Sequence, residues 1–111
     1  MPFTVSQAAN DVTVVTVDGQ LIVANRQELK QLMQDALDRG ARRFVVDFTP
    51  TAYIDSSGLG ALVSISKRVR EAGGDLRLAG LNEDLRSLFE LTKLDTLFTI
   101  ADSPAEALAG Y

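Results

Sequence analysis

The amino-acid sequence predicts an α/β fold with a mixed, mostly parallel sheet of four to five strands and about four helices. Two observations lead to this prediction. Short β-branched or apolar runs alternate with segments whose apolar residues recur at helical spacing, which is typical of parallel strands joined by helical crossovers. The first two strand-like runs are separated by only a few turn residues, and this spacing adds one antiparallel pair.

The first half of the chain contains a predicted hairpin, a helix and a buried strand. Residues 3–7 and 12–17 are rich in β-branched side chains, and residues 9–11 between them form a turn. A helix is then expected to begin at Asn25, with Glu28 as its capping partner, and to end at Gly40. Residues 43–48 form the short apolar run expected of a strand that is buried on both faces.

A second helix is predicted to begin within the run Asp55-Ser56-Ser57-Gly58-Leu59-Gly60-Ala61-Leu62. The side chains of Leu59, Leu62 and Val63 recur at helical spacing and are expected to face the core. Gly73 and Gly74 end this helix. The two serines are therefore expected at a helix N-terminus, where unpaired backbone amides and the helix dipole favour an anion.

The last third of the chain predicts two more helices and two more strands. Residues 76–80 alternate as a strand, and residues 97–100 are a further strand candidate. Asn82 is expected to cap a helix whose apolar face contains Leu85, Leu88, Phe89 and Leu91. Ser103, Pro104 and Glu106 together predict the start of a short final helix.

Composition narrows the function. A chain of 111 residues with 46% apolar residues is expected to form one domain over residues 1–111. It has no cysteine and no histidine, which excludes the usual zinc sites, the Ser-His-Asp triad and the Cys-His dyad. Most metal-dependent and triad hydrolases are therefore excluded, and we expect no metal and no cofactor. A net charge of −4 with scattered lysines and arginines predicts no nucleic acid or membrane partner. The absence of a long apolar run or signal peptide favours a cytoplasmic protein.

The serine-containing run allows several interpretations when it is taken alone. Ser56 or Ser57 could simply cap the helix, with glycines that permit a tight turn. A phosphate-binding loop is less favoured, because neither the P-loop nor the dinucleotide-binding pattern is present. A nucleophilic serine would need Asp47, Asp55, Lys67 or Lys93 as its base, without a nucleophile-elbow pattern.

The surrounding sequence resembles one family over nearly the whole chain. The resemblance rests on residues 45–48, Tyr53-Ile54, the run Asp55 to Leu62, the glycines at 73 and 74, and residues 85–91, with Gly19-Gln20-Leu21 and Leu94-Asp95 as further landmarks. This pattern closely resembles the STAS domain of bacterial anti-sigma factor antagonists. The resemblance implies a STAS-like fold and a protein without catalytic activity.

The resemblance also implies partner switching. In this family the unphosphorylated antagonist binds an anti-sigma factor, which is also a serine/threonine kinase, and so releases a sigma factor. The kinase then phosphorylates the antagonist, and a PP2C-type phosphatase reverses the modification. The match places the phosphate acceptor on Ser56. The implied partner surface comprises Asp55, Ser56, Ser57, Gly58, Leu59, Gly60 and Ile22.

Two questions stay open at this stage. Many family members carry an acidic residue where this chain has Ile22, so residues 21–24 could extend a strand into the core or expose an apolar patch to a different partner. The same fold also serves as a stand-alone scaffold, a transporter subunit, or a domain that binds a small ligand or nucleotide through the helix N-terminus.

Overall fold

The computed structural model describes residues 2–111, and within them an α/β architecture with two sheets and four α-helices. The main sheet has five strands in the order β1-β2-β4-β6-β7, and a separate two-stranded sheet pairs β3 with β5. The strands are β1 (Phe3–Ala8), β2 (Val12–Val17), β3 (Gly19–Leu21), β4 (Arg43–Asp47), β5 (Thr51–Ile54), β6 (Asp75–Ala79) and β7 (Thr99–Ala101). The helices are α1 (Arg26–Asp38), α2 (Ser56–Glu71), α3 (Glu83–Leu91) and α4 (Pro104–Ala109), with 3₁₀ turns at Ala9–Asp11 and Leu94–Thr96.

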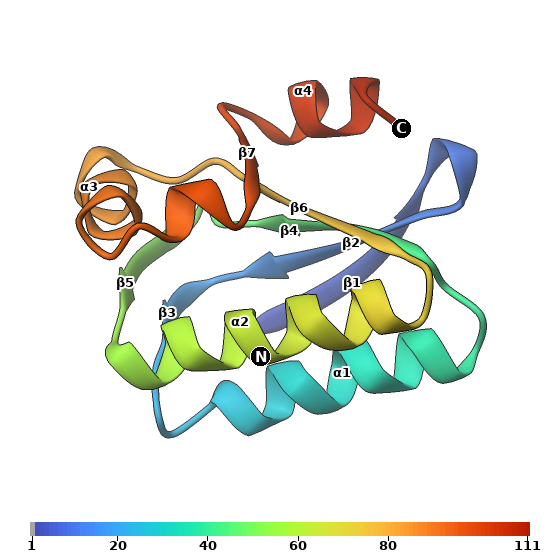
Figure 1. The fold of residues 1–111 in the computed structure, drawn as a ribbon, viewed down its shortest axis with the longest axis horizontal. Helices are drawn as coiled ribbons and strands as arrows, with labels where there is room; N and C mark the ends of the chain where they lie inside the picture. The colour runs from blue at the N-terminus through green and yellow to red at the C-terminus, as the bar shows by residue number, and fades with distance from the viewer. Residues whose placement is uncertain (1) are drawn as a thin grey trace.

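The predicted fold class is confirmed. The β1 strand is antiparallel to β2, and the remaining neighbours in the main sheet are parallel. Helices α1 and α2 lie side by side on one face of this sheet, whereas α4 lies on the other (Figure 1). Strand β4 is buried on both faces as predicted, because Phe44 and Val46 join the larger core cluster and Val45 joins the smaller one beneath α4.

Helix ends follow the local sequence in most places. Asn82 Oδ1 accepts from the Leu85 amide at 2.8 Å, and Ser103 Oγ accepts from the Glu106 amide at 3.2 Å, so both predicted caps are confirmed. Helix α1 ends at Asp38, and Gly40 follows with φ +99°, a conformation that suits glycine. These signals are local, which explains why the sequence alone predicts them.

Three details of the sequence-based prediction are wrong. Leu91 is 82% exposed instead of lying on the buried face of α3, because a position two residues after the buried Phe89 lies on the opposite side of a helix. Val63 is 37% exposed rather than part of the core. The last strand begins at Thr99, two residues later than expected, because Phe98 is used to pack edge-on against Phe89, with ring centroids 5.9 Å apart.

The small β3–β5 sheet was not predicted, and it positions the candidate site. Leu21 pairs with Ile54, and both side chains are buried. Each strand leads directly into a helix: β3 precedes α1 through residues 22–25, and β5 precedes α2 through Asp55. The start of α1 and the start of α2 are therefore brought together at one end of the molecule, as Figure 1 shows.

Candidate functional site

Asp55 joins the N-terminus of α2 to the loop that precedes α1. Its Oδ1 accepts a hydrogen bond from the Gly58 amide at 2.7 Å, which makes Asp55 the N-cap of α2. Its Oδ2 accepts from the Val23 amide at 3.0 Å, 32 residues away in the sequence. The Asp55 amide also donates to the Leu21 carbonyl at 3.1 Å. One carboxylate therefore fixes two separate segments against each other.

The serines lie at the helix N-terminus, as predicted, but neither of them caps the helix. Ser56 is the first residue of α2 and is exposed, while Ser57 is half-buried. Because Asp55 caps the N-terminus of α2, the Ser56 hydroxyl is not needed as a cap at the start of the helix. The simple capping interpretation is therefore wrong for both serines.

The two glycines of the run have different surroundings. A Cβ at Gly58 would collide with the Leu21 backbone oxygen and would lie 2.9 Å from Ile54 Cγ2, so the close contact between α2 and β3 requires a glycine. At Gly60 no atom lies within 4 Å of the position of a Cβ, and the residue is exposed. Nothing in the described fold requires a glycine at position 60.

Residues 22–25 form a turn that is held by Asn25. Its Oδ1 accepts from the Ile22 amide at 2.9 Å, and its Nδ2 donates to the Gln20 carbonyl at 2.9 Å. The predicted capping pair of Asn25 and Glu28 is therefore wrong, because the Asn25 side chain folds back onto the preceding loop. Residues 21–24 were expected either to extend a strand into the core or to expose an apolar patch. Leu21 ends a buried strand, whereas the apolar Val23 is 61% exposed.

The surface around Ser56 contains the apolar side chains of Tyr53 and Val63, which the sequence analysis did not assign to it. Tyr53 is 56% exposed two residues before the Asp55 cap. Val63 is exposed on α2 and lies about two turns after Ser56 on the same side of the helix. We define the Ser56 surface as Val23, Tyr53, Ser56, Gly60 and Val63. Tyr53 could have been recognised from its place beside the buried Ile54, since neighbouring strand residues point to opposite faces.

The residues expected on a partner surface thus divide into two groups. Ser56 and Gly60 are exposed, and Asp55, Ser57 and Ile22 are half-buried at the same end of the molecule. Gly58 and Leu59 are buried, and Leu59 belongs to the larger core cluster. The last two therefore shape the site from beneath.

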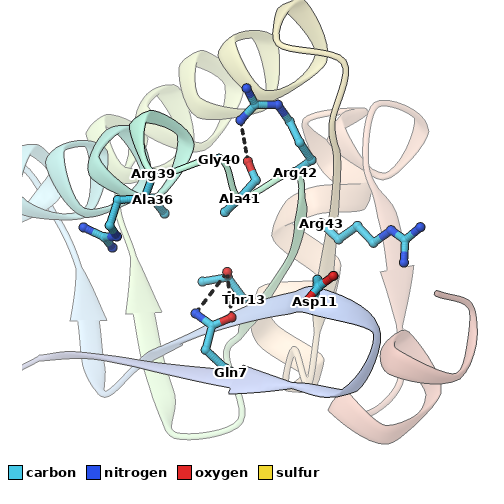
Figure 2. Close-up of a pocket in the computed structure, with 9 residues that line it drawn as sticks. All are labelled: Gln7, Asp11, Thr13, Ala36, Arg39, Gly40, Ala41, Arg42 and Arg43. Atoms are coloured by element: carbon cyan, nitrogen blue, oxygen red, sulfur yellow. Dashed lines mark hydrogen bonds between the residues drawn. The ribbon is translucent and has the colours of Figure 1, made fainter.

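A cavity of about 470 Å³ lies at the other end of α1 from the Ser56 surface. Gln7 and Thr13 point into it from the β1–β2 hairpin, and they are hydrogen-bonded to each other (Figure 2). Arg39, Arg42 and Arg43 stand around it, but their guanidinium groups point in different directions (Figure 2). Arg43 donates to the Asn10 carbonyl at 2.9 Å, and Arg42 to the Leu37 carbonyl at 3.0 Å. The guanidinium groups therefore do not converge on one anion.

Within residues 2–111, no group of three or more histidine, cysteine, aspartate or glutamate side chains could hold a metal ion. Among the helices within residues 2–111, none combines the length and the hydrophobicity of a membrane-spanning segment. Burial, followed by the charge of Asp75, raises the pKa of Tyr111 to about 12. Tyr111 lies after α4 and is not part of the Ser56 surface.

Comparisons with known proteins agree with one another. The STAS domain family model matches residues 4–107. BtrV of Bordetella bronchiseptica is 31% identical over 107 residues, which cover 89% of this chain and 92% of BtrV. The anti-sigma-B factor antagonist of Bacillus subtilis is 32% identical over 97 residues, which cover 87% of each protein. The crystal structure of TM1081 from Thermotoga maritima superposes with a TM-score of 0.90 and 28% identity, covering 97% of this chain and 92% of TM1081.

Proposed function

Because this chain belongs to the STAS domain family and its relatives include anti-sigma factor antagonists, we propose that it binds an anti-sigma factor and so releases a sigma factor for transcription. The anti-sigma factor is a serine/threonine kinase that phosphorylates Ser56 and thereby ends the complex. A PP2C-type phosphatase restores the binding form. The chain itself carries out no catalysis in this cycle, which takes place in the cytoplasm.

The observation that carries the proposal is the position of Ser56. Its hydroxyl is exposed on the first residue of α2, and Asp55 already performs the capping that would otherwise occupy it. The exposed side chains of Val23 and Tyr53 lie at the same end of the molecule and provide apolar area for a partner. A kinase can thus reach the hydroxyl on a surface that is also suited to binding.

Asp55 supports the switch by holding that surface together. Its bonds to the Gly58 and Val23 amides keep the loop and the helix in one fixed arrangement, so the surface is preformed. Preformed surfaces lose less conformational entropy on binding. Ile22 stands where the family resemblance implies an acidic residue, and we propose that the apolar Val23 beside it carries the contact instead.

Phosphorylation would change the surface without unfolding the domain. A phosphoserine carries a charge of about −1.5 to −2, and the free amides at a helix N-terminus favour such a group. A partner packed over Ser56 would instead meet this charge beside the Asp55 carboxylate. An unpaired charge in an interface costs about 2–5 kcal/mol, and about 1.4 kcal/mol corresponds to a tenfold change in affinity. A loss of affinity of at least about thirtyfold is therefore expected.

The phosphate acceptor is tested by incubation with an anti-sigma factor kinase from the same organism and ATP. We expect one phosphate per chain in the natural protein and in the Ser57→Ala control, and none in Ser56→Ala. Ser57 is a matched control because it is the adjacent hydroxyl and is less exposed. Stoichiometric phosphorylation of Ser56→Ala would show that the acceptor is a different residue.

The binding switch is tested separately with Ser56→Asp. An acidic residue in the first turn of a helix is stabilising, so the circular dichroism spectrum and the melting temperature should stay close to those of the natural protein. The affinity for the kinase should fall, and unchanged affinity would contradict the electrostatic mechanism. Calorimetry with GTP and ATP on the natural protein distinguishes this function from that of a nucleotide-binding domain, for which heat of binding is expected in the absence of any kinase.

A further inference from the structure

The β1 edge of the main sheet is long and carries no charged side chain. Strand β1 is the outer strand on its side of the sheet, and it is twice as long as β7 at the other edge, with six residues against three. Asp11 is the only charged residue among residues 1–17. Proteins commonly protect such edges with lysines, prolines inside the strand or bulges, because an open edge pairs readily with another strand. Strand β1 has none of these features: its register with β2 is regular from Phe3 to Ala8.

The hydrogen-bonding groups on this edge can be assigned from the register. Thr4 lies opposite Thr16 and Val5 opposite Val15 in the antiparallel pair. The Asp18 amide donates to the Pro2 carbonyl at 2.7 Å, which makes Pro2 and Asp18 a hydrogen-bonded pair. Because bonded and non-bonded pairs alternate along an antiparallel ladder, the backbone amides and carbonyls of Phe3, Val5 and Gln7 point away from β2.

We propose that this edge binds a second copy of the chain, with the two β1 strands antiparallel about a two-fold axis at Val5. The outward-pointing amides and carbonyls of one copy then face those of the other. Val5 lies opposite Val5 of the second copy, and Phe3 lies opposite Gln7 of the second copy. On the other face Thr4 lies opposite Ser6, a hydroxyl pair that favours cross-strand contact. The two five-stranded sheets become one continuous sheet of ten strands.

The charges on α1 favour a second copy as the occupant of this edge. Glu28 and Leu32 of α1 and Arg39, which directly follows α1 with a helical φ, recur at intervals of four and seven residues, so they lie along one side of the helix. This side faces the hairpin, because Arg39 and Ala36 line the same cavity as Gln7. Gln7 therefore lies near the C-terminal end of α1, and Val5 lies nearer the middle of this helix.

A two-fold axis at Val5 thus passes near the midpoint between Glu28 and Arg39. It makes the two α1 helices antiparallel, with Glu28 of each copy toward Arg39 of the other and Leu32 between them. Both charged residues are exposed, and the half-buried Leu32 packs against the larger core cluster. The same surface of each copy therefore presents opposite charges to the other copy, as an interface with two-fold symmetry requires.

The test is the mass of the natural protein in solution, measured by sedimentation or by light scattering across a concentration series. We expect twice the chain mass of 12.0 kDa at high concentration, with dissociation on dilution. Val5→Lys places two lysines opposite each other at the axis and should leave only the single chain. Val5 is 42% exposed, so the variant should keep its circular dichroism spectrum and melting temperature. Thr99→Lys is the matched control on the opposite edge and should still form the dimer.

A charge reversal tests the antiparallel arrangement of the helices. Glu28→Arg should weaken the dimer, because it places an arginine opposite Arg39 of the other copy. The double variant Glu28→Arg, Arg39→Glu should restore it. A single-chain mass at every concentration, a dimer that survives Val5→Lys, or a double variant no tighter than Glu28→Arg would overturn the proposal. Phosphorylation of Ser56 is measured independently, and this interface does not depend on it.

Discussion

The two glycines at the start of α2 provide the sharpest test of the site, because the same substitution should act in opposite directions at positions 58 and 60. Gly60 is the fifth residue of α2, is exposed and has no neighbour within 4 Å of a Cβ. Alanine is favoured over glycine inside a helix by about 0.8–1.0 kcal/mol. Gly60→Ala should therefore stabilise the free protein by about 1 kcal/mol, which raises the melting temperature by about 4 °C for a chain of this size.

Gly58→Ala should do the reverse. The added methyl group would collide with the Leu21 backbone oxygen, which cannot rotate away as a flexible side chain can. Overpacking of this kind costs about 1–3 kcal/mol, which the helix-propensity gain of at most about 1 kcal/mol offsets only in part. The melting temperature should fall, because β3 must shift away from α2.

The proposed function adds a second readout for Gly60→Ala. If a kinase packs closely over α2 next to Ser56, a methyl group at position 60 overpacks the interface at a cost of about 1–3 kcal/mol, and the affinity should fall at least about fivefold although the free protein is more stable. Thermal unfolding by circular dichroism gives the stability, and calorimetry with the kinase gives the affinity. A lower melting temperature of Gly60→Ala would refute the conclusion that a Cβ at position 60 has open space around it. Unchanged affinity would show that the partner does not approach this part of α2.

Three further predictions concern single side chains. Asp55→Asn keeps a good N-cap for the Gly58 amide but loses the acceptor for the Val23 amide. We therefore expect the free energy of unfolding to fall by about 1 kcal/mol and hydrogen exchange to be faster at the Val23 amide than at the Gly58 amide. Equal protection of both amides would contradict this role of Asp55. Tyr53→Ser should change stability by less than about 0.5 kcal/mol, because the ring is exposed, yet it should weaken kinase binding measured by calorimetry if Tyr53 is an anchor of the interface. The pKa of Tyr111 is raised from 10.0 to about 12, so the unfolded chain releases this proton first and stability falls as the pH rises from about 10 to 12. Tyr111→Phe should show a shallower decline in denaturant unfolding across that window, and an identical pH dependence would show that the tyrosine stays accessible to base.

Much of the fold could be predicted because its signals are local. The caps at Asn82 and Ser103 depend on residues within one helical turn, and the buried strand β4 is visible as a continuous apolar run. The β3–β5 pair could not be predicted in this way. Strands of three and four residues are too short for a periodic pattern, and their pairing joins segments about thirty residues apart.

The candidate site shows the same division. The run from Asp55 to Gly60 already indicated a helix N-terminus that carries the two serines, and that placement is confirmed. The sequence could not show which residue caps the helix, because aspartate and serine are both favoured at that position. It also could not separate Gly58 from Gly60, since the difference lies in a backbone oxygen that comes from position 21.

By itself, the sequence determined the order of the four helices and of the five strands of the main sheet, the absence of histidine and cysteine chemistry, and the place of Ser56 at the start of a helix. The tertiary structure alone decided what surrounds that serine. The bond between Asp55 and the Val23 amide spans 32 residues, and it fixes an exposed apolar loop beside the helix. Contacts of this kind depend on how the whole chain packs, whereas helix starts and buried strands are set by a few neighbouring residues.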